Sequence, residues 1–165
     1  EGKDVGMGER GQLLLSGPSI AMGYWNQPEL TAITFVDGWF HTGDAAMRDA
    51  DGYFYIVDRM KDMYISGGEN VYPAEVEAAI AELSTIAECA VIGVPDDRWG
   101  EVGRAYITPA AGMDVTVEAV MAHCLLRMAK FKVPKTFVLT ATIPRTSSGK
   151  VQKNVLRERA LGELG

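Results

Sequence analysis

Cysteine and histidine are scarce in this chain, and their scarcity limits the kinds of site that it can build. The 165 residues include two cysteines, Cys89 and Cys124, and two histidines, His41 and His123. Both cysteines have apolar neighbours, which predicts buried free thiols and suits a reducing cytoplasm better than a disulfide framework. His123 lies off the apolar side of its predicted helix, and we expect it to be solvated. No His, Cys or carboxylate pair has metal-ligand spacing, so we expect no protein-held zinc.

Long apolar runs are also absent. No run approaches the roughly 18 residues that a membrane-spanning helix needs, and the N-terminus lacks the pattern of a signal peptide. The composition is instead that of an ordinary globular protein, with 47% hydrophobic and 23% charged residues. The first residue is Glu1 rather than Met, and we therefore expect the chain to begin inside a longer protein.

The charge is distributed unevenly along the chain. The formal net charge is −6, but residues 127–159 contain nine Lys and Arg and a single acid, Glu158, which gives this segment +8 and leaves −14 for the rest. An acidic body argues against nucleic acid as a partner. The basic segment could bind a small polyanion, such as a nucleotide or a coenzyme phosphate, or it could be an ordinary solvated surface.

Residues 1–58 are rich in strand and turn signals. GQLLLSG predicts a short strand, and a helix is expected to begin at Pro28. GWFHTGDAAM and DGYFYIVD predict two strands, separated by the turn-forming RDADG. This part does not resemble a complete domain, and we interpret it as the β-rich end of a larger N-terminal domain.

From residue 59 to residue 165 the pattern becomes α+β. Helices are predicted from Pro73, over 117–128 and from about Asn154, because apolar residues recur there at helical spacing. ECAVIGV, GRAYITPA and KTFVLTA predict strands between them. The expected fold class is therefore α+β: a small C-terminal domain, residues 59–165, with a three-stranded sheet and flanking helices, which follows the β-rich remnant.

Two polar side chains next to predicted strands could bind a nucleotide. Asp44 belongs to a Thr-Gly-Asp turn that is expected to end a strand, and its carboxylate could accept hydrogen bonds from both hydroxyls of a ribose. Arg59 follows a strand, and its planar fork could bind ribose or phosphate oxygens. Each also has an ordinary interpretation, Asp44 as a turn residue and Arg59 as an ion-pair partner of Asp58 or Asp62.

Two loops carry glycine or lysine in patterns that could serve a ligand. Gly67 and Gly68 precede a predicted helix and permit unusual backbone angles or close approach by a thin ligand. PRTSSGKVQK presents Lys150 on what we expect to be a flexible Ser-Ser-Gly arm. It is not a Walker phosphate loop, because Pro144 takes the place of the first glycine and Val151 follows the lysine.

Taken together, these segments are more specific than any one of them. The order of these segments and their residues resemble the C-terminal portion of the adenylate-forming superfamily, and within it the acyl-CoA synthetases. The resemblance covers nearly the whole chain and rests on these stretches: GQLLLSGPSIAMGYWNQPELT, GWFHTGD, DGYFYIVDRMKDMYISGGENVYPAEVE, AVIGVPDDRWGE, KFKVPK and PRTSSGKVQK.

The resemblance implies a two-step reaction and a role for several residues. ATP, with Mg²⁺, and a carboxylic acid would give an acyl-adenylate, and CoA would then displace AMP. Asp44 and Arg59 would hold the ribose, Lys150 would promote adenylation, and Lys61 would be the hinge between two domain positions. The resemblance also implies that four residues line the path of CoA: Ser66, Gly67, Gly68 and Trp99. Trp99 could equally be a packing residue.

Three further expectations follow from the resemblance. The phosphate loop and acid pocket of the family are not in this sequence, so the chain is expected to need a missing N-terminal domain and to be inactive alone. PRTSSGK fits the pattern at which relatives are acetylated, which makes a lysine acetyltransferase a possible partner at Lys150. An adenylation domain that loads a carrier protein, and a non-catalytic nucleotide- or CoA-binding module, remain alternatives.

Overall fold

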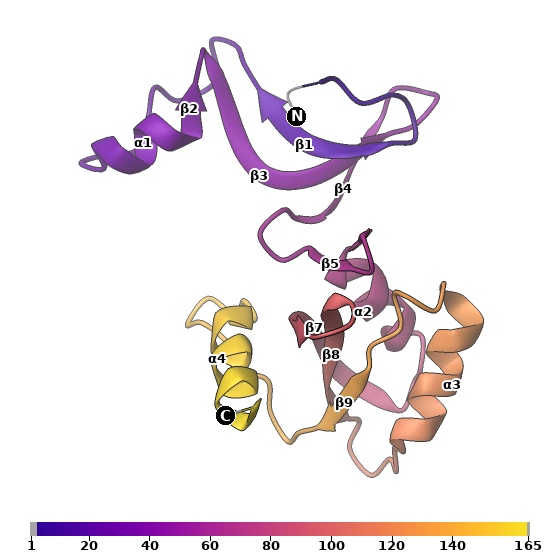
Figure 1. Ribbon diagram of the computed structural model, residues 1–165. Helices are drawn as coiled ribbons and strands as arrows, with labels where there is room; N and C mark the ends of the chain where they lie inside the picture. The colour runs from indigo at the N-terminus through magenta and orange to yellow at the C-terminus, as the bar shows by residue number, and fades with distance from the viewer. Residues whose placement is uncertain (1–2, 165) are drawn as a thin grey trace. The chain divides into compact units, whose positions relative to one another are not determined.

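The computed structural model describes residues 3–164, which form two compact units divided between Lys61 and Asp62. This division lies three residues after the position that the sequence suggests. Unit 1 precedes it and unit 2 follows it, and Figure 1 shows the elements of each. No helix in the described part is long and apolar enough to span a membrane.

Unit 1 is built around one long strand. Strand β3 (Trp39–Arg48) pairs antiparallel with β1 (Arg10–Leu15) on one edge. Its other edge pairs with the short β2 (Phe35–Val36) and with β4 (Phe54–Arg59). Helix α1 (Pro28–Thr34) begins with proline, whose fixed φ suits the first helical position. The predicted strand pair and helix are therefore present in unit 1.

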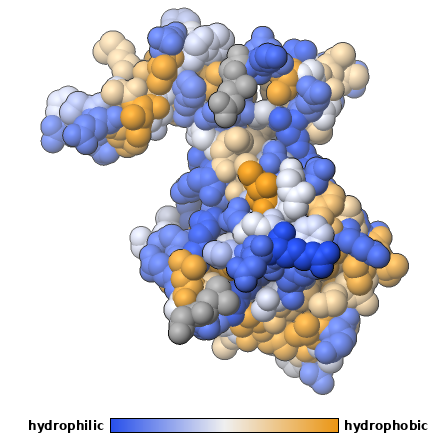
Figure 2. Space-filling view, viewed as in Figure 1, coloured by the Kyte–Doolittle hydropathy of each residue, from blue (hydrophilic) through white to orange (hydrophobic). Residues whose placement is uncertain are grey.

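Unit 1 buries little apolar surface of its own. Among its described residues only Ala45 and Ala46 are buried apolar side chains. Met22 and Trp25 are 97% and 96% exposed, and Ile33 is 73% exposed. Figure 2 shows apolar residues on the visible surface of this unit. The unit therefore has a hydrogen-bonded sheet without a hydrophobic core in the described part.

Unit 2 is organised by a five-stranded sheet rather than the three-stranded one that we expected. Its main strands are β7 (Ile86–Asp96), β8 (Gly100–Pro109) and β9 (Thr136–Leu139), the last parallel to β8. The additional strands are β5 (Tyr64–Ser66) and β6 (Glu69–Val71), a hairpin that joins the start of β8. Three-residue strands on either side of two glycines show no alternating pattern, so the sequence suggests only a loop there.

Helices cover both faces of this sheet (Figure 1). One face packs against α2 (Pro73–Ala81) and α3 (Val117–Arg127), with Val76, Ile80, Val91, Val120 and Ile107 among the core residues. The other face packs against α4 (Lys153–Leu164), with Ile92, Tyr106, Ile143, Leu156 and Ala160. Neighbouring residues of β7, such as Val91 and Ile92, point to opposite faces, as the two-residue period of a strand requires. Unit 2 therefore has two hydrophobic cores.

A pair of glycines lets one side chain cross this sheet closely. Gly93 and Gly103 are cross-strand partners, and Tyr64 lies over them with 1% exposure. A Cβ on Gly93 would lie 2.4 Å from Tyr64 Cβ, and one on Gly103 would lie 2.4 Å from the Tyr64 hydroxyl oxygen. The two glycines thus fix the β5–β6 hairpin against β7 and β8, because only a residue without a Cβ leaves room for the ring.

Candidate functional site

Asp44 and Arg59 are direct neighbours in unit 1. They face each other across strands β3 and β4, and Arg59 Nε lies 2.9 Å from Asp44 Oδ1. Arg59 also donates from Nη1 to the Thr42 carbonyl oxygen at 3.2 Å. The Asp44 side chain is 24% exposed and that of Arg59 is 55% exposed. The pair therefore presents a carboxylate and an oriented guanidinium to solvent, which together can bind hydroxyl groups and oxyanions.

The local backbone differs from the expected turn. Thr42, Gly43 and Asp44 lie inside β3, where Gly43 has φ +73 and the pairing with β4 shifts register between Ala45 and Ala46. The Arg59 side chain forms its ion pair with Asp44 rather than with Asp58 or Asp62. Asp58 instead accepts a hydrogen bond from the Arg59 backbone N–H at 2.7 Å. The bulge thus brings together two residues that are fifteen positions apart.

The turn of the β5–β6 hairpin is made by Gly67 and Gly68. Both have positive φ, +62 and +88, which two-residue hairpin turns favour and glycine adopts without strain. The Gly67 N–H donates to the Trp99 carbonyl oxygen at 2.9 Å. A Cβ on Gly67 would lie 2.7 Å from Trp99 Cε3. Ser66, both glycines and Trp99 are therefore brought together at one place, with the glycine backbone against the indole.

A pocket of about 390 Å³ opens beside this hairpin, and the family resemblance implies roles for only two of its residues, Ser66 and Trp99. Its lining is made by Ser66, Trp99, Val102, Lys130, Phe131, Val133 and Lys135. Two cations lie near the Trp99 ring, with Lys135 Nζ at 5.7 Å and Arg98 Cζ at 5.1 Å from its centroid. An aromatic ring bordered by lysines suits a ligand that carries both a planar or apolar group and a phosphate. The KFKVPK stretch was the available sequence signal for Lys130, Phe131 and Lys135.

Lys150 lies at the end of a tight, hydrogen-bonded turn, which is the stretch that we expected to be a flexible arm. Thr146 donates its N–H to the Lys150 carbonyl oxygen at 2.8 Å, and its Oγ1 accepts from the Lys150 N–H at 3.1 Å. Gly149 has φ +83, and Arg145 donates to its carbonyl oxygen at 2.6 Å. Lys150 itself is exposed, and within the described residues its ammonium makes no hydrogen bond or ion pair. The ordered turn thus presents one cation to solvent.

Most of the other basic side chains near the C-terminus are neutralised within unit 2. Five of the nine are ion-paired to acids that come earlier in the chain: Arg127–Glu82, Lys132–Glu75, Arg145–Glu88, Lys153–Glu77 and Arg157–Asp62. Neither sequence interpretation, a polyanion site or a solvated surface, describes the whole segment. Its positive charge is largely internal, and Lys130, Lys135 and Lys150 are the lysines placed at the pocket and the turn.

His123 is partly buried, so the expectation of a solvated imidazole was wrong. Its side chain is 17% exposed, and Nε2 lies 2.9 Å from the Ala79 carbonyl oxygen and 3.5 Å from Glu82. The end of α2 creates this environment, which the pattern of α3 alone does not reveal. Of the two thiols, Cys124 is buried and Cys89 half-buried, and both are free as predicted. Burial raises the pKa of the Cys89 thiol to about 12.

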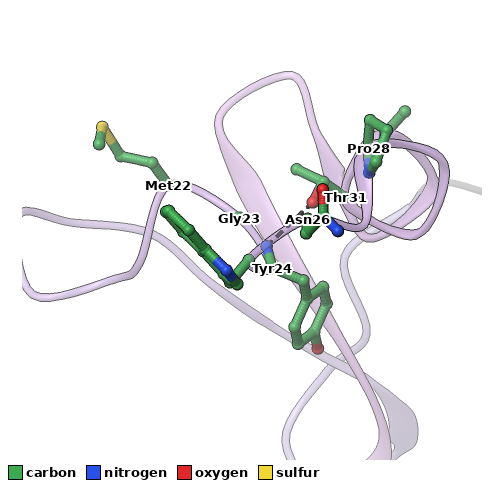
Figure 3. Close-up of a pocket in the computed structure, with 8 residues that line it drawn as sticks. Met22, Gly23, Tyr24, Asn26, Pro28 and Thr31 are labelled. Atoms are coloured by element: carbon green, nitrogen blue, oxygen red, sulfur yellow. Dashed lines mark hydrogen bonds between the residues drawn. The ribbon is translucent and has the colours of Figure 1, made fainter.

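Another recess lies in unit 1. It has a volume of about 530 Å³ and surrounds the GYWN stretch, with Met22, Tyr24 and Pro28 in its wall (Figure 3). The Tyr24 N–H donates to Thr31 Oγ1 at 2.9 Å, which joins this stretch to α1. The recess is open and contains no charged side chain, so we assign it no ligand. No group of three or more potential metal ligands occurs among the described residues.

The arrangement defines a class of protein: an α+β unit with a lysine on a C-terminal turn, attached to a strand pair that carries an Asp–Arg site. The AMP-binding enzyme C-terminal domain family matches residues 75–150. An octahydroindenyl-propanoyl:CoA ligase of Rhodococcus jostii (strain RHA1) is 53% identical over 158 residues, covering 95% of this chain and 31% of that protein. A feruloyl-CoA synthase of Amycolatopsis sp is 51% identical over 158 residues, which cover 96% of this chain and 32% of that protein.

Solved structures agree with this assignment. The anthranilate CoA ligase AuaEII in complex with anthranoyl-AMP superposes with a TM-score of 0.88 at 35% identity, covering 96% of this chain and 31% of that one. The chain spans about a third of the length of the curated relatives that it matches. The match to the AMP-binding enzyme C-terminal domain, together with similarity over nearly the whole chain to about a third of each CoA ligase, confirms the resemblance to the C-terminal portion of the acyl-CoA synthetases seen in the sequence.

Proposed function

We propose that this chain is the C-terminal portion of an AMP-forming acid–thiol ligase, which activates a carboxylic acid with ATP and transfers it to CoA. The observation that carries the proposal is the similarity along nearly the whole chain to proteins named as CoA ligases. In this proposal unit 1 ends the large adenylating domain, and unit 2 is the mobile C-terminal domain. The acid would be selected by that larger domain, in line with the different acids in the relatives' names.

Asp44 and Arg59 are proposed to bind the ribose of ATP. Arg59 Nε occupies one carboxylate oxygen of Asp44, which leaves the other oxygen and the remaining guanidinium donors for the sugar hydroxyls. The existing ion pair orients both groups before the nucleotide arrives, which reduces the entropy lost on binding. Magnesium would be bound chiefly by the phosphates of ATP, since the described residues offer no ligand cluster.

Lys150 is proposed to promote attack of the carboxylate on the α-phosphate. The two reacting groups are both anionic, and a cation between them offsets their repulsion as the bond forms. At about 4 Å and an effective dielectric constant of about 20, one such charge pair contributes roughly 4 kcal/mol. The ordered turn from Arg145 to Val151 supports this role, because it fixes the backbone of the lysine while leaving its ammonium unpaired.

The pocket beside Trp99 is proposed to bind CoA in the second step. Gly67 and Gly68 would allow the thin pantetheine chain to pass close to the backbone, with Ser66 and Trp99 beside it. Lys130 and Lys135 would attract the coenzyme's phosphates. Lys61 would be the hinge about which unit 2 moves between the two steps, and it is the last residue of unit 1.

Separate assays of the two half-reactions test these roles in the full-length protein. Lys150→Ala should slow pyrophosphate release by about 10²-fold or more, as expected for loss of one transition-state donor, and spare thioester formation from preformed acyl-adenylate. Lys61→Pro should do the reverse, because proline restricts the hinge torsion.

A panel of carboxylic acids, with CoA, a carrier protein or no acceptor, identifies the substrate and separates this proposal from carrier loading. The present chain alone should form no acyl-CoA, and equal slowing of both steps by both variants would contradict the two-position account.

A lysine acetyltransferase is a further proposed partner. Lys150 is exposed on a turn, where an enzyme could reach it, and acetylation would remove its charge. Adenylation by the full-length protein should therefore fall in proportion to the acetylated fraction measured by mass spectrometry. Full adenylation by completely acetylated protein would refute this regulation.

A further inference from the structure

The residues on either side of Lys61 are attached to different parts of the fold. On the N-terminal side, Arg59 is paired to Asp44, and the Met60 N–H donates to the Gly43 carbonyl oxygen at 2.8 Å. These contacts hold the chain to strand β3 as far as Met60. The Lys61 side chain is exposed and makes no hydrogen bond or ion pair within the described residues.

On the C-terminal side, the first residue of unit 2 is tied to the last helix. Asp62 Oδ1 accepts from Arg157 Nη2 at 2.8 Å, although 95 positions separate the two residues. The Asp62 side chain is 13% exposed and that of Arg157 is 32% exposed, so the pair is better shielded than an ordinary surface ion pair. Two residues later Tyr64 is anchored in the core. Without the pair, the first anchored residue after Lys61 would be Tyr64.

Helix α4 continues this attachment to the turn that carries Lys150. Leu156 and Ala160 are buried on the sheet, and the Tyr106 hydroxyl donates to the Leu156 carbonyl oxygen at 3.3 Å. Just before the helix, the Gln152 N–H donates to the Pro144 carbonyl oxygen at 2.9 Å and closes the Lys150 turn. Asp62 is therefore connected to Lys150 through Arg157, one rigid helix and one closed turn.

We infer that the Asp62–Arg157 ion pair is a clamp that sets the length of the hinge. With the clamp closed, the unattached segment is Lys61 alone, and without it the segment extends from Lys61 to Met63. Arg157 is thus a positioning residue. It keeps the unattached segment down to Lys61, so that the Lys150 turn moves as one body with the backbone that follows Lys61. The inference rests on the proposed function for its catalytic consequence but not for its effect on backbone motion.

Backbone motion can be tested on the 165-residue chain itself by ¹⁵N relaxation. In the unaltered chain we expect order parameters of about 0.85 at Asp62 and Met63, as in rigid backbone, and a lower value at Lys61. Arg157→Met, which keeps the apolar stem but removes the charge, should lower the values at Asp62 and Met63 to about 0.6 or less. Arg157→Lys should restore them in part, because it can still form one ion pair.

Glu163→Gln is the matched control, since it breaks another ion pair of α4, the one with Arg104, six positions after Arg157 on the same helix. It should leave the order parameters of Asp62 and Met63 unchanged. If Arg157→Met leaves them unchanged as well, or if both residues are already mobile in the unaltered chain, the clamp does not exist. If Glu163→Gln loosens them equally, the attachment of α4 as a whole is responsible and the inference is wrong.

The catalytic consequence is tested in the full-length ligase. Arg157→Met should lower the rate constant of adenylation about tenfold with an unchanged KM for ATP, because misplacement of a catalytic group reduces the rate without removing nucleotide contacts. Arg157→Lys should recover most of the rate, and Glu163→Gln should keep it. Failure of the full-length protein to make any acyl-CoA would refute the proposed function but not the clamp. An active enzyme in which Arg157→Met adenylates normally would refute the clamp's role in catalysis.

Discussion

The two units of this chain differ in how much apolar surface they bury. Unit 2 buries apolar side chains on both faces of its sheet, whereas the described part of unit 1 buries only two alanines. Unit 1 nevertheless has regular strands, a helix that begins at proline and an oriented ion pair. The difference shows that hydrogen bonding and turn chemistry can specify local structure, while the stability of a fold depends on buried apolar surface.

The largest expected effect is seen when the units are separated. Residues 62–165 alone should unfold in one cooperative transition, because both cores of unit 2 lie within them. Residues 1–61 alone should show no such transition, since about 60 residues without a core cannot offset the loss of chain entropy. Circular dichroism during urea titration measures both. Cooperative unfolding of residues 1–61 would contradict the comparison.

The next effect contrasts tight packing in unit 2 with loose packing in unit 1. Gly103→Ala places a Cβ against the buried Tyr64 ring and the Pro134 backbone, and should cost about 2–3 kcal/mol of unfolding free energy. Gly11→Ala in unit 1 places one 2.9 Å from a methyl group of Val5, a half-exposed side chain that can move. Its cost should be under about 1 kcal/mol. Equal costs in chemical denaturation would show that the two units are equally well packed.

Alkaline pH should destabilise unit 2 in particular, because both thiols and Tyr64 belong to it. Burial raises the pKa of the Cys89 thiol from 9 to about 12, so the folded state keeps its proton where the unfolded state loses it. The stabilising contribution is complete below about pH 9 and is lost as the pH rises toward 12. Burial likewise raises the pKa of Tyr64. Urea midpoints between pH 7 and pH 11 should therefore fall, and Cys89→Ala should make the fall shallower.

The smallest expected effect concerns single hydroxyl groups within unit 2. The Tyr64 hydroxyl is buried and has no hydrogen-bond partner among the described residues, so Tyr64→Phe should be neutral or stabilising by up to about 1 kcal/mol. The Tyr106 hydroxyl donates to the Leu156 carbonyl oxygen, and Tyr106→Phe should cost about 0.5–1.5 kcal/mol. Thermal unfolding of the two variants compares them directly. A larger loss for Tyr64→Phe would reveal a partner for its hydroxyl.

The sequence predicted those elements whose signals are local. Apolar periodicity indicated α3, proline indicated the starts of α1 and α2, and the Asp-Gly turn indicated the pairing of β3 with β4. The β5–β6 hairpin was missed because its strands are too short to show a period. Side-chain chemistry suggested that Asp44 and Arg59 could bind a nucleotide, whereas the role of Lys150 came from the family resemblance.

Contacts between distant segments could not be predicted in the same way. The register of β3 and β4 places Asp44 opposite Arg59, and the position of α2 decides the environment of His123. The pocket lysines, Lys130 and Lys135, depend on where the segment before β9 passes Trp99. Each of these facts follows from tertiary packing, and a pattern within one segment does not contain it.

The internal pairing of the basic C-terminal segment has a kinetic consequence. A formal charge of +8 over residues 127–159 would attract anions from a distance and make their arrival strongly dependent on ionic strength. Five of its nine cations, however, are already matched by carboxylates of the same unit, and the field that reaches beyond a Debye length is correspondingly weak. The association rate of an anionic ligand with this unit should therefore change little with added salt. Short-range contacts at the surface, rather than long-range attraction during approach, would then decide which anion binds.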